Sequence, residues 1–423
     1  MHSTPWYEWR MAMDPRRRPG ADNNLGPWLR WGGTGLAAGA AVASVLAATS
    51  SGLAAYYARM IVIPNRRRED LTILAVAGAA GERRVVLPAT SDTTVPGRYA
   101  LYVDGGAGRA LIGDILSLDG STVTRAVVGG DETALAAATR GWWSGDIITD
   151  PDEIGLPHED VQIGTPAGTA PAWRIDPTDP GSPAAATWVI GIHGRGARRS
   201  ETLRAASVMH RLGHTMLAIS YRNDGEGPRA DGGRYGLGGT EWRDVDAAIA
   251  FALDHGAERI VLLGYSMGGA VALQTVDQST WAHRIAALVL DAPVVDWTDV
   301  LGYQAKLNRV PDSIGQFSQL MISHPAGRAV TGLVAPVDLK SMDWVSRADQ
   351  LRTPTLIIHS VDDDFVPSAP SEELARRNPD FVRFVPFEGA RHTKEWNVDP
   401  ERWESVVAGW LPTALRASDP APR

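Results

Sequence analysis

The sequence predicts an α/β fold, with helices covering both faces of a mostly parallel sheet. From about residue 158 onward, short apolar runs alternate with helical segments. Strands that are apolar throughout are buried on both faces, as in a parallel sheet between two helical layers. The expected strands include 187–192, 216–220, 260–263, 286–290 and 355–358, and the expected helices include 241–255, 268–276 and 400–415.

Two further segments are expected around this α/β domain, which we place at residues 158–415. Residues 294–350 interrupt the strand and helix alternation, so we expect a small cap there. Residues 69–150 hold short β-prone runs separated by turn signals such as Asp104-Gly105-Gly106, which predicts a small β-rich module.

The N-terminal segment has a different composition. Residues 1–30 are polar and rich in arginine, so we expect them to be disordered. Residues 31–58 carry no charge, and about 20 apolar residues can span a bilayer. We predict a single transmembrane helix over 31–58, and a cleaved signal peptide or a buried soluble helix are the alternatives. Four arginines lie near each end, so charge sets no orientation; we expect the larger domain on the extracytoplasmic side.

Composition excludes several classes of function. The net charge is −8, which leaves no basic surplus for binding nucleic acid. The chain has no cysteine, which excludes disulfides, a thiolate nucleophile and cysteine-bound zinc. No phosphate-binding loop, dinucleotide fingerprint or HExxH motif occurs, so we expect neither a cofactor nor a metal.

The strongest motif is Gly264-Tyr265-Ser266-Met267-Gly268, which directly follows a predicted strand and opens a predicted helix. This is the pattern of a nucleophile elbow. A sharp strand-to-helix turn lifts the serine hydroxyl above the sheet edge, and glycines two residues away on each side clear the space. The sequence therefore predicts Ser266 as a nucleophile.

A loop after an earlier strand is expected to help hold a developing oxyanion. The strand 187–192 ends in His193-Gly194-Arg195-Gly196, and folds with such an elbow place one backbone donor after a step of this kind. We assign this donor to the Arg195 N–H, with Gly196 as the alternative, and the second donor to the Met267 N–H. For His193 we favour a structural role.

The acid and the base are expected after the nucleophile in chain order. Strand 355–358 leads into a loop with three candidate acids, Asp362, Asp363 and Asp364. Adjacent carboxylates repel one another, so not all three can turn towards one imidazole. The only histidine after this loop is His392, which we predict as the base that takes the proton from Ser266.

Residues 160–415 resemble the α/β-hydrolase superfamily, in particular its esterase/lipase and prolyl-oligopeptidase-like branches. The resemblance rests on several segments: His193-Gly194, Tyr221-Arg222-Asn223, Gly264 to Gly269, Leu290-Asp291-Ala292-Pro293, Val366-Pro367 and Gly389 to His392. In this family the acid typically lies four residues after a His-Gly step and three before Val-Pro. The resemblance thus implies Asp363, although Ser360 replaces the usual glycine and leaves Asp362 as the alternative.

The resemblance implies a serine hydrolase that cleaves a carboxylic ester or a related acyl bond. We expect a small-molecule or lipid acyl substrate, reached at a membrane. An acyltransferase with the same acyl-enzyme and a serine peptidase are alternatives, and a non-catalytic binding protein is a third. The segment before the α/β domain is too short for the propeller of the large oligopeptidases, which disfavours the peptidase.

Overall fold

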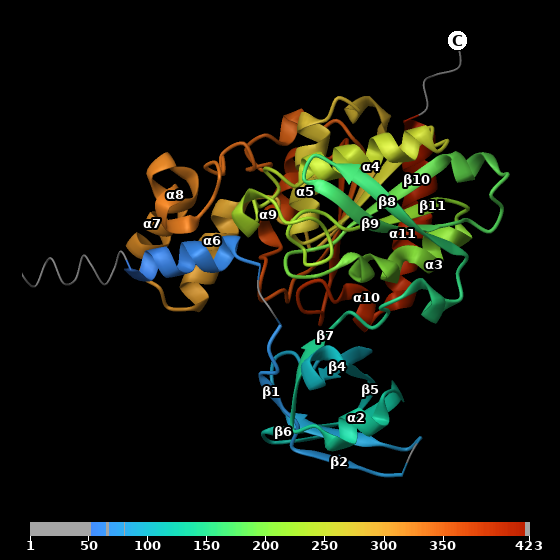
Figure 1. Ribbon diagram of the computed structural model, residues 1–423, viewed down its shortest axis with the longest axis vertical. Coiled ribbons are helices and arrows are strands. Elements are labelled where there is room, and N and C mark those ends of the chain that lie inside the picture. Colours follow the sequence, from blue (N-terminus) through green and yellow to red (C-terminus); the bar gives the residue numbers. More distant parts are fainter. Residues whose placement is uncertain (1–51, 65–66, 80, 419–423) are drawn as a thin grey trace, which may run out of the picture. The chain divides into compact units, whose positions relative to one another are not determined.

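The computed structural model describes residues 52–64, 67–79 and 81–418 (Figure 1). The described residues lie almost wholly in one compact unit, residues 53–423.

An eight-stranded sheet organises the C-terminal region, with strand order β15-β14-β13-β12-β10-β11-β9-β8 (Figure 1). The strands from β15 to β11 in this order run parallel, and β9 and β8 pair antiparallel at one edge. Each strand predicted from an apolar run is present within two residues of its expected bounds. The strands are β8 (His158–Thr165), β9 (Gly168–Ile175), β10 (Thr187–Ile192), β11 (Thr215–Ile219), β12 (Arg259–Tyr265), β13 (Ile285–Asp291), β14 (Thr355–Ser360) and β15 (Val382–Phe387).

Helices cover both faces of this sheet, because alternate strand residues point to opposite sides. In β12, Leu262 packs in one core with α4 (Trp242–Asp254) and α5 (Met267–Gln278). Val261 and Leu263 pack in a second core with α3 (Ala206–Arg211) and α11 (Pro400–Ala417). The predicted arrangement of a mostly parallel sheet between two helical layers is therefore present.

The segment between β13 and β14 contains three helices where the cap was expected. They are α6 (Trp297–Leu307), α7 (Asp312–Ser323) and α8 (Arg328–Thr331). Buried side chains of α6 and of α7, such as Trp297 and Ile322, join the same core as α4 and α5. The cap is therefore packed firmly onto the α/β domain.

A separate seven-stranded antiparallel sheet precedes the α/β domain, in the order β1-β7-β4-β5-β6-β3-β2. Its own apolar core is small and includes Val85, Leu101 and Ile112. Its strands are β1 (Leu71–Thr72), β2 (Ala75–Ala77), β3 (Arg84–Pro88), β4 (Tyr99–Val103), β5 (Gly108–Asp119), β6 (Thr122–Gly130) and β7 (Arg140–Ser144).

The structure contains a helix over residues 52–62, which overlaps the C-terminal end of the predicted membrane span. Its buried residues Ala54, Ala58 and Val62 recur every four positions and therefore share one face. Ala54 packs against Val310 and Ile314 of the cap region, and Ala58 and Val62 join the main core. The prediction that the span continues to residue 58 is wrong, because these small side chains contact protein.

The rest of the predicted span and the predicted disordered segment 1–30 lie outside the described residues. In the described part of the chain, no helix has both the length and the apolar character needed to cross a membrane.

Candidate active site

Ser266 lies on a sharp turn between β12 and α5. Its backbone φ is 53° and ψ is −117°, a conformation that a residue with a side chain rarely adopts. The Ser266 N–H donates to Asp291 O over 3.0 Å, and Ser266 O accepts from the N–H groups of Gly269 and Val294. These hydrogen bonds hold the strained residue in place.

The two flanking glycines are required by the close approach of backbone atoms. A Cβ atom at Gly268 would lie 2.1 Å from Ile192 O, and one at Gly264 would lie 2.6 Å from Gly268 O. Any larger residue at either position would push the turn open. The glycines of the predicted elbow therefore allow the tight packing that places Ser266.

The structure brings Ser266, His392 and Asp363 together in one hydrogen-bonded chain. His392 Nε2 lies 2.8 Å from Ser266 Oγ, and His392 Nδ1 lies 2.7 Å from Asp363 Oδ2. Ser266 is 7% exposed and Asp363 5% exposed, so the chain is largely shielded from solvent. This geometry suits transfer of the serine proton to the imidazole, with the carboxylate fixing the ring.

Asp363 is held by its own loop as well as by His392. Its Oδ1 accepts from the N–H groups of Phe365 and Val366, at 2.8 and 2.9 Å, and its Oδ2 also lies 3.2 Å from His359 Nε2. Burial opposes ionisation of Asp363, but the charge of His392 and the hydrogen bonds from both histidines keep its pKa well below its usual range. Asp363 is therefore ionised and available to stabilise an imidazolium.

The two neighbouring aspartates take different positions. Asp362 Oδ2 accepts from the Gly389 N–H over 2.7 Å, and Asp364 has a half-exposed side chain 4.0 Å from Arg391. Ser360 replaces the glycine of the family pattern, and its Oγ donates to Ala390 O over 2.7 Å. Ser360 therefore links the acid loop to the segment that carries His392.

The loop after β10 lies directly beside the elbow. A Cβ atom at Gly194 would lie 3.1 Å from Ser266 Cβ. The Gly194 N–H donates to Glu201 over 2.7 Å, and the Gly196 N–H is 3.4 Å from the Tyr235 hydroxyl. Within the described residues, the N–H groups of Arg195 and Met267 have no protein acceptor. These two donors are thus free to bind an oxyanion.

His193 is fully buried and supports this loop. Its Nε2 lies 3.0 Å from Asp224 Oδ2, its Nδ1 lies 2.9 Å from Gly194 O, and its ring stacks on Tyr221 with centroids 4.2 Å apart. Burial favours the neutral ring, yet the hydrogen bond and charge of Asp224 raise the pKa of His193. These contacts fit the structural role predicted for this residue.

Comparison with protein families now identifies the fold. The model of the alpha/beta hydrolase family matches residues 189–407, more than half of the chain. The chain belongs to the α/β hydrolase family. The predicted fold class is confirmed at this level. A second family model, a domain of unknown function (DUF8805), matches residues 72–144 of the hydrolase. None of the curated proteins compared with the chain matches it.

Several solved structures are similar to the hydrolase. An esterase of Pyrococcus furiosus is 21% identical, with a TM-score of 0.47 over 63% of this chain and 94% of the esterase. A thermophilic esterase from Thermogutta terrifontis is also 21% identical, with a TM-score of 0.42 over 60% and 99%. Est1E from Butyrivibrio proteoclasticus is 14% identical, with a TM-score of 0.44 over 61% and 99%.

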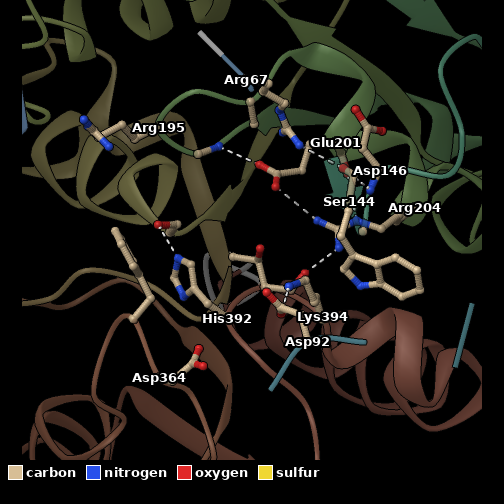
Figure 2. Close-up of a pocket in the computed structure, with 17 residues that line it drawn as sticks. Arg67, Asp92, Ser144, Asp146, Arg195, Glu201, Arg204, Asp364, His392 and Lys394 are labelled. Atoms are coloured by element: carbon tan, nitrogen blue, oxygen red, sulfur yellow. Dashed lines mark hydrogen bonds and ion pairs between the residues drawn. The ribbon is translucent and has the colours of Figure 1, made fainter. Parts of the chain in front are cut away.

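A polar cavity of about 280 Å³ opens beside Ser266 and His392 of the hydrolase (Figure 2). The β-rich module forms part of its wall. Lys394 Nζ pairs with Asp92 Oδ1 at 2.5 Å, and Arg67 donates to Ser144 Oγ over 2.9 Å. Besides Ser266 and His392, the charged and polar side chains that line it are Arg67, Asp92, Ser144, Asp146, Arg195, Glu201, Arg204, Asp364, Thr393 and Lys394.

A second cavity, of about 180 Å³, also reaches Ser266. Its lining is mainly apolar and comes chiefly from the helix over residues 52–62, from α6 and α7, and from Phe365, and it includes the charged side chain of Arg195. The cap was predicted from the sequence, but the contribution of this helix to the cavity was not. The uncharged composition of this segment indicated an apolar helix. It did not show whether that helix packs against lipid or against protein.

A buried carboxyl pair, Asp291 and Glu395, was also not predicted from the sequence. Asp291 and Glu395 are both fully buried, and Asp291 Oδ1 and Glu395 Oε2 have no hydrogen-bond partner among the described residues. Burial and the nearby charge of Asp291 raise the pKa of Glu395 well above its usual range. Glu395 Oε1 accepts from the Ser360 N–H over 2.8 Å, so the pair braces the acid loop. Glu395 lies three residues after His392, and that spacing was the only signal in the sequence.

Proposed function

We propose that the protein is a serine hydrolase that cleaves a carboxylic ester through an acyl-enzyme on Ser266. The hydrogen-bonded chain from Ser266 through His392 to Asp363, on a strained elbow, carries this proposal. Two small cavities meet at Ser266, and their size favours an ester with two compact parts over a long peptide.

In the proposed first step, Ser266 Oγ attacks the ester carbonyl carbon while His392 Nε2 takes the serine proton. The carbonyl oxygen becomes an oxyanion, which the N–H groups of Arg195 and Met267 stabilise. Asp363 stabilises the imidazolium that forms. The C–O bond to the alcohol then breaks, and His392 returns its proton to the leaving alcohol.

In the second step, water replaces the alcohol. His392 takes a proton from the water as it attacks the acyl carbon, and the bond to Ser266 Oγ breaks. Ser266 recovers its proton from His392, and the carboxylic acid leaves. An acyltransferase would differ only here, with another alcohol or an amine in place of water.

Covalent labelling tests the proposal. A fluorophosphonate probe should modify Ser266, as mapped by mass spectrometry, and ester substrates should be turned over with release of the free acid. Absence of labelling would favour a non-catalytic binding protein. Cleavage of peptides but not esters would favour the peptidase, and ester exchange with an added alcohol at the expense of free acid would favour the acyltransferase.

We also propose that the enzyme is held in a membrane, with its catalytic domain outside the cytoplasm, by a span that ends before residue 52. The proposal rests on the uncharged sequence from 31 to 51, about the length that crosses a bilayer. Full-length protein should sediment with membranes, resist a carbonate wash and require detergent for release. Recovery of uncleaved protein in the soluble fraction would contradict it.

A further inference from the structure

The apolar cavity at Ser266 has a wall from outside the family-matched residues. Tyr57, Met60 and Ile61 of the helix over residues 52–62 line it. On the facing side it is lined by residues of the cap, including Trp297 and Leu301 of α6. The cavity therefore lies between the N-terminal helix and the cap and ends at the proposed nucleophile.

The helix is fixed to the loop that carries a proposed oxyanion donor. The Arg195 guanidinium donates to Ile61 O over 2.7 Å and to Ile63 O over 3.2 Å, and also to Met60 O. Carbonyl groups at the end of a helix lack partners within the helix and carry partial negative charge. The side chain of Arg195 thus caps this helix while its backbone N–H is free for the oxyanion.

Other contacts hold the helix along its length. Ser318 Oγ of α7 donates to Ala54 O over 3.0 Å, and the Tyr235 N–H donates to Val62 O over 2.8 Å. Arg59 donates to Val330 O over 2.8 Å. These bonds reach both ends of the described helix, so the wall it forms is fixed relative to the cap.

We propose that the helix over residues 52–62 is the specificity wall of an acyl pocket that takes an aliphatic chain. The proposal rests on the proposed function, because the pocket has this meaning only if Ser266 carries the acyl group. Its lining is mainly apolar, and the guanidinium of Arg195, the charged group in that lining, already donates to carbonyl groups of the helix. The pocket therefore suits an aliphatic chain better than a charged group, which would lose its hydration on entering. Apart from Arg195, which lines both cavities, the charged groups beside Ser266 line the other cavity, so the acyl chain occupies the mainly apolar one.

The wall offers a matched pair of residues for a test. Tyr57 is half-buried and lines the pocket, whereas its neighbour Tyr56 is 60% exposed and does not. Removing the ring of Tyr57 should lengthen the pocket, and enlarging it with Tyr57→Trp should shorten the pocket. Tyr56→Ala removes the same ring from the outer face of the same helix.

The experiment measures kcat/KM of the full-length protein in detergent for p-nitrophenyl esters from acetate to laurate. With the parent, kcat/KM should rise about fourfold per added methylene until the pocket is full, and then fall. Tyr57→Ala should move the best chain length upward, Tyr57→Trp should move it downward, and Tyr56→Ala should leave it unchanged.

Two outcomes would overturn the proposal: no dependence on chain length in the parent, or the same profile for both Tyr57 variants. Labelling by a fluorophosphonate distinguishes failure of the pocket proposal from failure of the proposed function. Labelling requires a reactive Ser266 but does not require that the helix over residues 52–62 select the acyl chain. Arg195→Met provides a second test, since it keeps the backbone N–H and removes the helix cap. It should reduce laurate turnover more than acetate turnover, and an equal loss on both would contradict the wall.

Discussion

The two cavities that meet at Ser266 differ in chemistry and in origin. The apolar one, of about 180 Å³, is formed by the helix over residues 52–62 and the cap. The polar one, of about 280 Å³, is lined by charged side chains, two of which, Asp92 and Asp146, come from the β-rich module. One cavity suits an aliphatic group, and the other suits a group with hydrogen-bonding partners.

The difference indicates a division of roles along the chain. The residues of the proposed chemistry, Ser266, Asp363 and His392, lie within the family-matched segment 189–407. Part of the wall of each cavity comes from residues that precede it, such as Tyr57 and Asp92. We therefore expect changes in the α/β core to affect the rate for every substrate, and changes in the preceding segments to affect the choice of substrate.

The largest effect is expected for Ser266→Ala, because this variant lacks the proposed nucleophile, Ser266 Oγ, which lies where the two cavities meet. Removal of such a nucleophile lowers kcat by about 10⁴–10⁶-fold. The loss should be the same for short-chain, long-chain and polar esters, measured as steady-state turnover. An unchanged circular dichroism spectrum serves as the control for folding. Activity within tenfold of the parent would show that Ser266 is not the nucleophile.

The next largest effect is expected for Asp363→Asn. An amide at this position cannot stabilise the imidazolium and can fix the wrong tautomer of His392, which lowers the rate by about 10⁴-fold. Asp364→Asn is the matched control, because Asp364 is half-exposed and, among the described residues, has no hydrogen bond or ion pair with His392. If Asp362→Asn proved more damaging than Asp363→Asn, the assignment of the acid would be wrong.

The geometry around Ser266 could be predicted from the sequence because it depends on local rules. The glycines around Ser266 are required by backbone contacts within one turn, and chain order left His392 as the only base. Among the three adjacent aspartates the residues alone left the choice open. In the structure, Asp363 alone of the three is hydrogen-bonded to His392.

The walls could not be predicted in this way, because they depend on contacts between distant segments. Arg195 caps a helix more than 130 positions earlier in the chain, and no local pattern identifies that partner. An uncharged stretch rich in alanine predicts a buried helix but does not distinguish lipid from protein as its surroundings. For this reason the predicted span extended too far, through Ala54 and Ala58.

A smaller effect is expected at Asp146, on the polar side. Burial raises the pKa of Asp146 from its ordinary value to about 6, and a hydrogen bond from Ser200 partly opposes this. Between about pH 4 and 6 the folded protein therefore binds more protons than the unfolded chain, so Asp146 lowers stability as the pH rises. Relative to the parent, Asp146→Asn should gain about 2 kcal/mol between pH 4 and 7.

Thermal melting of both proteins across this pH range measures the effect. The melting temperature of Asp146→Asn should exceed that of the parent by more at pH 7 than at pH 4. Ser200→Ala removes the hydrogen bond that favours the ionised form, so the pH dependence should become steeper. A difference between Asp146→Asn and the parent that stays constant with pH would contradict the assignment.

The smallest effect is expected at Arg67, which lines the polar cavity but not the apolar one. A change at Arg67 therefore tests the polar cavity alone. Arg67 and Arg68 are both exposed, but Arg67 lines the polar cavity and donates to Ser144 Oγ, whereas Arg68 does not line it. One hydrogen bond contributes about 1 kcal/mol, which corresponds to about fivefold in kcat/KM. Arg67→Ala should therefore lower kcat/KM about fivefold for esters of a polyhydroxy alcohol, such as glycerol, and leave kcat/KM for p-nitrophenyl esters nearly unchanged.

Arg68→Ala is the control and should change kcat/KM for neither class of ester. In both variants the acyl-chain preference should stay that of the parent. A shift in acyl-chain preference on Arg67→Ala would show that the two cavities do not select the two parts of the substrate separately.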